Sequence, residues 1–404
     1  MNTSPPSRLP FLDGLRVSAF ALLVPYHVGM YYVSWDWHVK SPAAGNTLEP
    51  FMLLTAPWRL GLLFLIAGAA CQGLMARRGT LGTLKDRSLR LLLPLVFGMA
   101  VIVTPQAYFE LLTKAPALLP GDGGYLDFWW AYLQGGKYCR GSDCMDVPTW
   151  NHLWFLPYLW VYAIVGALLS AAWRRPVPAL SLPSWRWLVV PAVPLVLARV
   201  FVMPHFPSTH DLVHDLYNHL QYAWLFAIGW ASRTPAGQGL WAAALRLRWP
   251  ALGLAVSGWA VLIVYFTHYA NTPPPFAVLN AQRVLWGCMS WCAILAACGW
   301  AQRAFTRESA LLRQASAAVF CLYILHQSVI VVLSQWLKPL ALPWGTEALL
   351  LTALTFGAAS LGYMVLRRVP GLAVLFGIQR RAHGRGQAAS PVGATPSRVL
   401  AKHR

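Results

Sequence analysis

The sequence predicts an all-α protein, a polytopic transmembrane helix bundle of about ten spans with both chain ends in the cytoplasm. Three observations predict it. Of the 404 residues, 57% are hydrophobic, only 11% are charged, and apolar runs of spanning length recur along the whole chain. Soluble domains typically carry about 25% charged residues, and each crossing needs roughly 20 apolar residues. Little of the chain is therefore left for a separate soluble domain.

The candidate spans follow from the length of each apolar run. We expect them at residues 12–33, 52–75, 90–112, 150–172, 187–204, 217–232, 250–269, 281–301, 315–337 and 346–367. Aromatic residues crowd many span ends, as at Trp129, Trp130 and Trp150, which is typical of the membrane interface. No small-residue cleavage site follows the first run, so we expect a retained helix and not a secretory signal peptide.

Basic residues collect in alternate short loops, which is the pattern of membrane topology. With the N-terminus inside, the outer loops receive only Lys40, Lys114, Lys137, Arg140 and Lys338. The pattern predicts an N-in, C-in chain, and it explains the net charge of +19 without a nucleic-acid partner. Three arginines depart from it, because Arg59, Arg199 and Arg283 fall near outer span ends.

Two segments are not predicted to span. Residues 113–149 form the longest outer loop, in which Cys139 and Cys144 either form a disulfide, if that side is an oxidising periplasm, or remain thiols. Residues 380–404 are basic and rich in Ala, Gly and Ser, which favours a disordered cytoplasmic tail and leaves residues 1–379 as the membrane-embedded domain. No internal repeat is visible, which weakens the case for a transporter built from duplicated halves.

The first span carries an arginine and a histidine, which are costly in a membrane. Arg16 and His27 are eleven residues apart, which places them on one helix face and roughly 16 Å apart along the axis. Arg16 lies near the cytoplasmic end, where snorkelling to the headgroups would also explain it. His27 lies past the midplane, where it is either a packed histidine or a general base. Asp13 precedes Arg16 by one turn, so the two can pair.

Other polar groups lie at span ends or inside spans. Arg87 and Arg90 share a face at the inner start of the third span, where topology alone would explain them and an anion clamp is the functional alternative. Asn151, His152 and Trp154 open the fourth span at its outer end, and an aromatic belt explains only the tryptophan. His326 lies about midway along the ninth span.

A metal site has little support in the sequence. His210 and His214 are one turn apart in an outer segment, but no separate Cys or Glu partner stands with them. We therefore expect no metal, and we interpret this segment as a hydrated stretch with polar groups that face a sugar.

The motifs resemble one family. The segment FLDGLRVSAFALLVPYHVGMYYVSWDWHVKS is similar to the opening of the acyltransferase-3 membrane family, particularly the branch that includes the periplasmic-glucan succinyltransferase. The family pattern of arginine or lysine, ten residues and histidine matches Arg16 and His27. Its Arg-x-x-Arg pattern matches Arg87 and Arg90. For both pairs, these matches favour the functional interpretation over one based on packing or topology alone.

Later motifs extend the resemblance over most of the chain. The family's HLWFL segment matches residues 152–156, and its Tyr-x-x-His pattern matches Tyr323 and His326. One position departs from the family. Many members carry a Ser-Gly pair in the second span, whereas Ala67 replaces the serine here, so no role of that hydroxyl transfers to this chain.

The resemblance implies an O-acyltransferase in the bacterial inner membrane, surrounded by lipid. It implies acyl-CoA, as succinyl-CoA or acetyl-CoA, as the cytoplasmic donor substrate, a hydroxyl of an extracytoplasmic glycan as the acceptor, and no tightly bound cofactor. Catalysis is then expected of His27 with Arg16 and Asp13, and CoA phosphate contacts of Arg87 and Arg90. The expected acceptor contacts are Asn151, His152, Trp154 and His326.

Two other classes stay open at this point. A transporter or flippase of a glycan or lipid-linked sugar would share the spans and the buried charges, although its site should lie between repeated halves. A haem protein would need histidines paired on facing helices, and His27 and His326 are the pair that the spans allow. The acyl group, the acceptor and the oligomeric state are left open.

Overall fold

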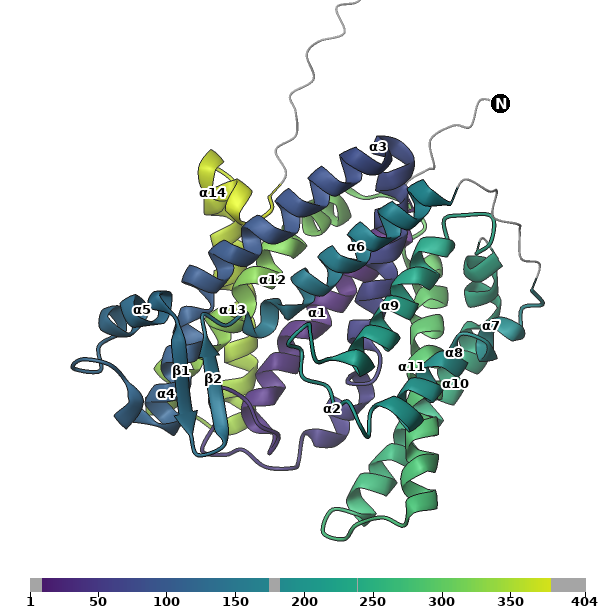
Figure 1. Ribbon diagram of the computed structural model, residues 1–404. Helices are drawn as coiled ribbons and strands as arrows, with labels where there is room; N and C mark the ends of the chain where they lie inside the picture. The colour runs from purple at the N-terminus through teal and green to yellow at the C-terminus, as the bar shows by residue number, and fades with distance from the viewer. Residues whose placement is uncertain (1–8, 174–181, 238, 379–404) are drawn as a thin grey trace, which may run out of the picture.

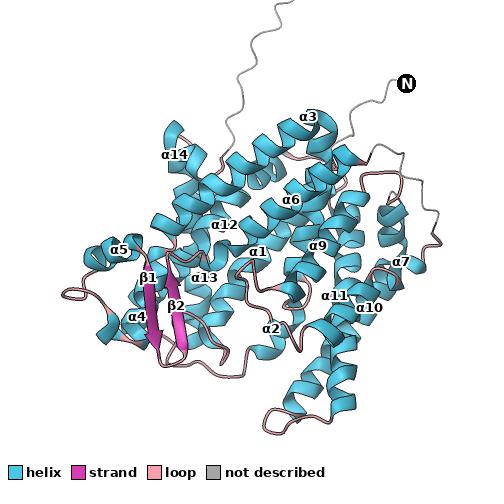
Figure 2. Ribbon diagram, viewed as in Figure 1, coloured by secondary structure: helices cyan, strands magenta, loops and turns pink. Residues whose placement is uncertain are grey.

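A computed structural model describes residues 9–173, 182–237 and 239–378, and these residues are mostly helical (Figures 1 and 2). This confirms the predicted all-α class. The tail expected at residues 380–404 lies outside the described residues. The long helices are α1 (Pro10–Tyr32), α3 (Arg59–Phe97), α6 (Phe155–Ala172), α9 (Leu216–Ala231), α10 (Gly239–His268), α11 (Phe276–Ala304), α12 (Ala310–Leu337) and α13 (Trp344–Leu366). The short helices are α2 (Glu49–Thr55), α4 (Thr104–Lys114), α5 (Tyr125–Gln134), α7 (Arg186–Val189), α8 (Ala192–Leu197) and α14 (Pro370–Leu375).

Among the described residues, seven helical segments are long and apolar enough to cross a membrane. One of them, Glu49–Lys114, holds two of the predicted spans, because α3 turns back at Gly79. Gly79 has φ of 66°, a left-handed conformation that glycine adopts without steric cost. The span expected at 187–204 falls on two short helices, α7 and α8, and the span expected at 217–232 falls on α9. The count of ten and the orientation stay predictions.

Helix α1 occupies the centre of the bundle and contacts α3, α11, α12 and α13 (Figure 1). Its apolar side chains, such as Leu23, Val24 and Tyr31, are almost fully buried. Because Arg16 and His27 both lie on this central helix, its packing fixes their relative positions. We call the end of the bundle with Arg16 the arginine end and the end with His27 the histidine end.

Helices α3 and α9 pack closely through glycine. A Cβ on Gly68 would lie 2.0 Å from the carbonyl oxygen of Phe226, and a Cβ on Gly229 would lie 1.9 Å from that of Leu65. Small residues let two membrane helices approach each other this closely. Gly68 follows Ala67, so the glycine of the family's Ser-Gly pair serves packing here.

The loop expected at residues 113–149 is folded. It contains α5 and a hairpin of two antiparallel strands, β1 (Gly136–Arg140) and β2 (Asp143–Val147). Cys139 and Cys144 face each other in the hairpin and form a disulfide. The bridge that the sequence left open is therefore present. The hairpin lies beside α4 and α5 at the edge of the bundle (Figure 2).

Candidate active site

Three arginines gather at the arginine end. Arg16 donates from Nη2 to Asp13 Oδ1 at 3.1 Å and to Ser316 on α12, and Ser316 Oγ donates to the same carboxylate at 2.9 Å. The ion pair that the sequence predicts between residues 13 and 16 is thus present. It holds the guanidinium in one place and ties α1 to α12.

The other two arginines come from the second leg of α3. Arg90 Nε lies 3.1 Å from Oδ1 of the buried Asp86, which also pairs with Arg78 at 2.9 Å. Arg87 Nε is buried and has no hydrogen-bond partner among the described residues. Asp13 balances Arg16, whereas Asp86 is shared by Arg78 and Arg90. The ion pairs of the described residues thus leave positive charge beside the cavity that Arg16, Arg87 and Arg90 line, which suits a polyanionic ligand.

A cavity of about 310 Å³ begins at these arginines and runs into the bundle. It is within the usual range of small-molecule sites. Its walls are mostly apolar and come from α1, α3, α6 and α12. They include Phe20, Leu23, Leu63, Ala67, Phe155 and Tyr323. A ligand with a charged head and a thin apolar arm fits this combination.

Three of the helices that line the cavity carry a polar residue one turn beyond their last lining residue at the inner end of the cavity. On α1 the lining residues Arg16, Phe20 and Leu23 are spaced by four and three, so His27 is next on that face. On α12 the residue one turn after Tyr323 is His326. On α3 the residue one turn before Leu63 is Arg59. The cavity therefore points from the arginine end toward His27.

His27 and His326 form a direct pair. Nε2 of His326 lies 3.1 Å from Nδ1 of His27, and the ring centroids are 5.0 Å apart. His326 is fully buried, whereas His27 keeps part of its side chain exposed. Residues 299 positions apart in the chain thus meet at the centre of the bundle.

The hydrogen bonds fix which nitrogen carries each proton. Nδ1 of His326 lies 2.6 Å from the carbonyl oxygen of Tyr323, which can only accept, so His326 donates from Nδ1. Its Nε2 in the neutral ring is then an acceptor, and His27 must donate from Nδ1. Nε2 of His27 has no hydrogen-bond partner among the described residues. Its lone pair is therefore available to a substrate proton.

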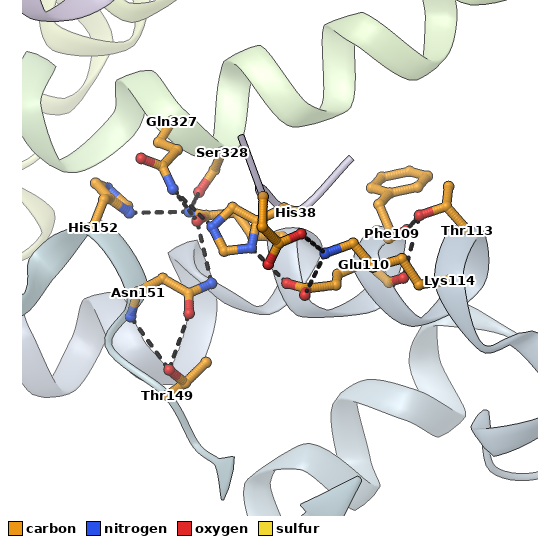
Figure 3. A network of polar contacts seen from close by, with 12 residues as sticks. His38, Phe109, Glu110, Thr113, Lys114, Thr149, Asn151, His152, Gln327 and Ser328 are labelled. Atoms are coloured by element: carbon orange, nitrogen blue, oxygen red, sulfur yellow. Dashed lines mark hydrogen bonds and ion pairs between the residues drawn. The ribbon is translucent and has the colours of Figure 1, made fainter. Parts of the chain in front are cut away.

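A network of polar side chains lies at the histidine end (Figure 3). It reaches the pair through His152, whose ring centroid is 5.3 Å from that of His326. Gln106 on α4 is its hub. Its Nε2 donates to His152 Nδ1 at 3.1 Å and to Ser328 Oγ at 2.7 Å. Its Oε1 accepts from Asn151 Nδ2 at 3.3 Å and Gln327 Nε2 at 3.0 Å. All four of these side chains come from other elements, so the hub fixes their relative positions.

Charged groups extend this network. Gln327 Nε2 donates to His38 Nε2 at 2.9 Å, and His38 Nδ1 lies 2.6 Å from Glu110 Oε2. Lys114 then pairs with Glu110 at 3.1 Å and with the exposed Asp36 at 3.0 Å. A continuous chain of hydrogen bonds and ion pairs therefore joins the buried glutamines to the surface.

Comparisons with known proteins assign this chain to a family. The family model of the acyltransferase domain matches residues 9–364, nearly the whole described chain. This chain belongs to the acyltransferase-3 family. It is 27% identical over 156 residues to glucans biosynthesis protein C of Escherichia coli K12 and of strain SMS-3-5. Those residues are 39% of this chain and only 37% of each relative, and no solved structure matches. With the apolar helices, membership supports a multi-pass membrane acyltransferase.

The motif residues of the acyltransferase-3 family differ in how they are held. Both ring nitrogens of the buried His152 are used by the protein, because its Nε2 lies 3.0 Å from the carbonyl oxygen of Ile324 and its Nδ1 accepts from Gln106. Asn151 is bonded to Gln106 and Thr149. These contacts favour a framework role for both. Their sugar contacts stay predictions.

Trp154 lies in an aromatic cluster beside the segment that carries His210. Its ring centroid is 4.1 Å from that of His210 and 5.6 Å from that of Tyr222. Burial lowers the pKa of His210. His214 is exposed and pairs with Asp211, so the two histidines point to different surroundings. Among the described residues, no group of three or more His, Cys, Asp or Glu side chains could hold a metal ion.

The haem alternative conflicts with the histidine pair. Nitrogens that ligate one metal from opposite sides lie about 4 Å apart, since each Fe–N or Zn–N bond is about 2 Å. The two nitrogens that face each other here are 3.1 Å apart and hydrogen-bonded. The pair is thus arranged as a proton-holding dyad.

The sequence missed three groups of the site. Gln106, Gln327 and His38 were not expected, although each lies in or beside an apolar run. Gln327 directly follows His326, and Gln106 lies inside the third predicted span. Polar side chains in a membrane span are themselves a signal of function.

Proposed function

We propose that this protein transfers an acyl group, succinyl or acetyl, from cytoplasmic acyl-CoA to a hydroxyl of an extracytoplasmic glycan, such as a periplasmic glucan. The observation that carries the proposal is the cavity that begins at Arg16, Arg87 and Arg90 and points to His27. It combines an anion-binding mouth with an apolar channel and ends one turn short of an available base. The family and the distant likeness to glucans biosynthesis protein C support it.

The donor binds from the arginine end. Arginine forks match phosphate oxygens, so Arg87, Arg90 and Arg16 contact the phosphates of CoA. The thin arm that carries the thioester follows the apolar channel past Phe20 and Leu23. The acyl carbonyl then lies beside His27. In this arrangement the arginine end, the N-terminus and the C-terminus are on the cytoplasmic side.

The acceptor hydroxyl arrives from the histidine end. His27 Nε2 takes its proton while the oxygen attacks the thioester carbonyl. The tetrahedral intermediate then expels the CoA thiolate, which receives the proton from His27. The products are a glycan ester and CoA thiol. A route through an acyl-histidine would use the same nitrogen as the nucleophile.

His326 is a positioning residue in this reaction. Its Nε2 accepts a hydrogen bond from Nδ1–H of His27 and so keeps the lone pair of His27 on Nε2, which faces the substrate. When His27 becomes an imidazolium, His326 and the carbonyl of Tyr323 stabilise the charge. A second histidine thus does the work that a carboxylate does in a serine hydrolase triad.

The test is mass spectrometry of periplasmic and envelope glycans from three strains: the wild type, a deletion, and the deletion carrying His27→Ala. We expect an acyl mass that disappears in the deletion and stays absent with His27→Ala, because general-base catalysis contributes about 10²–10⁴-fold. The mass difference also separates acetyl from succinyl.

The matched control is His268→Ala, which removes an exposed histidine at the end of α10 and should restore the acyl mass. Membrane levels of both variants are measured by immunoblot. Full restoration by His27→Ala would refute the mechanism and favour transport of a glycan without acyl-transfer chemistry.

A further inference from the structure

Arg59 is a buried cation whose charge no described acidic group neutralises. It begins α3 and is 8% exposed. Its Nε and Nη1 are buried without a hydrogen-bond partner among the described residues. The guanidinium stacks on Tyr26, with Cζ 3.3 Å from the ring centroid. The aromatic face offsets part of the desolvation cost, but a stacked ring does not accept the hydrogen bonds that Nε and Nη1 direct in the plane of the guanidinium.

Other arginines of the bundle have a hydrogen bond or an ion pair, although Nε of Arg199 is also buried without a partner among the described residues. Arg16 and Arg90 each have a carboxylate, and Arg199 donates from Nη1 to Tyr217 Oη at 2.9 Å while it stacks on Trp286. A buried charge without a carboxylate partner is costly, and an anionic ligand would offset that cost. Arg59 therefore suggests that an anionic ligand group binds at the histidine end of the bundle.

The position of Arg59 relates that ligand to the donor channel. Ala70, Ala67 and Leu63 line the cavity along one face of α3, and Arg59 is the next residue on that face, about 6 Å further along the axis. On the neighbouring helix Tyr26 stacks between Arg59 and His27, and its ring centroid is 5.8 Å from that of His27. Arg59 thus lies past the end of the channel and beside the base.

We infer that Arg59 binds the far carboxylate of a dicarboxylic acyl group and so makes this enzyme selective for succinyl-type donors over acetyl. The inference rests on the proposed function and names its donor class. In a succinyl thioester the free carboxylate is three bonds past the reacting carbonyl, on the side away from CoA. A thioester that enters from the arginine end and stops at His27 therefore extends this carboxylate toward Arg59.

The test compares succinyl-CoA with acetyl-CoA on the full-length protein in nanodiscs. Transfer to glucan is measured for the wild type, Arg59→Gln and Arg59→Lys. Because charge-assisted hydrogen bonds are lost, we expect kcat/KM for succinyl-CoA to fall roughly 10–100-fold in Arg59→Gln, with a smaller fall in Arg59→Lys. For acetyl-CoA we expect a change of less than about 3-fold. The ratio of the two donors on one preparation does not depend on how much protein is folded.

Arg199→Gln is the matched control, since it removes a second aromatic-stacked arginine away from the channel, and it should leave the donor ratio unchanged. Equal losses for both donors would overturn the inference and assign Arg59 to the oxyanion of the intermediate. An unchanged ratio, or a wild type that prefers acetyl-CoA, would also overturn it. A loss that depends on anionic substituents of the glucan would mean that Arg59 binds the acceptor and not the acyl group, which would overturn the inference.

Binding separates this inference from the proposed function. Equilibrium binding of both donors is measured in the His27→Ala background, with and without Arg59→Gln. Tighter succinyl-CoA binding that requires Arg59 supports the inference even if no variant transfers an acyl group, in which case the proposed reaction fails alone. Binding of both donors without any dependence on Arg59 overturns the inference alone.

Discussion

The two ends of the bundle differ in charge, in exposure to water and in hydrogen bonding. At the arginine end, charged side chains are partly exposed and line an open cavity, and positive charge remains because Asp86 is shared by two arginines. At the histidine end, neutral amides, imidazoles and hydroxyls bond to one another and are mostly buried around Gln106. The first arrangement can accept and release a large anion, because water still reaches it. The second holds side chains in one geometry, because the groups around Gln106 share a network of hydrogen bonds.

The difference separates binding from positioning. Changes at the arginine end should alter how tightly the donor binds, whereas changes at the histidine end should alter turnover or the stability of the fold. His27 lies where the two meet, with one nitrogen fixed by His326 and the other open. The following substitutions test that division.

The largest effect in this set is expected at His326. His326→Leu removes the acceptor that holds His27 in its reactive tautomer, so kcat should fall about 100-fold, while KM for acyl-CoA stays within about 2-fold. His326→Gln keeps an acceptor oxygen, and it should regain at least about a third of the lost free energy of activation. Steady-state kinetics of both variants in nanodiscs checks this. Equal losses in both, or a change in KM alone, would contradict the positioning role.

Much of the fold could be predicted from the sequence because membrane helices are local patterns. Run length gave the apolar helices, and the 3.6-residue period placed Arg16 and His27 on one face and Asp13 within reach of Arg16. The hairpin was missed, since residues 113–149 showed turn residues without a long alternating pattern. The spacing of Cys139 and Cys144 left their disulfide open, because spacing alone does not fix Cβ directions.

The site was harder to predict, because its decisive contacts are non-local. Arg16 and His27 are visible in one helix, but the pairing of His27 with His326 joins residues 299 positions apart. Gln327 and His38 are separated by 289 positions. No spacing rule connects such residues. His152 was predicted as a sugar contact, and only the structure reveals that its two ring nitrogens are already bonded.

A loss of stability is expected next, at the hub of the polar network. Gln106→Leu leaves buried donors and acceptors on His152, Asn151 and Gln327 without their partner, at about 1–3 kcal/mol of unfolding free energy. We expect a lower midpoint of thermal unfolding in detergent. Gln335→Leu is the control, since this glutamine donates only to Ser334 at 3.2 Å. An equal or larger shift in the control would mean that the network does not stabilise the histidine end.

The smallest effect is expected at the arginine end. Arg87→Gln removes a half-buried cation that lines the cavity mouth, so KM for acyl-CoA should rise about 10-fold with kcat within about 2-fold, because one charge-assisted contact contributes about 1.5 kcal/mol. The affinity should also depend less on salt in the variant, since fewer charges attract the phosphates. Arg303→Gln removes an exposed arginine that does not line the cavity, and it should change neither constant. A fall in kcat without a change in KM would place Arg87 in the catalytic step, and the division between a binding end and a positioning end would then be wrong.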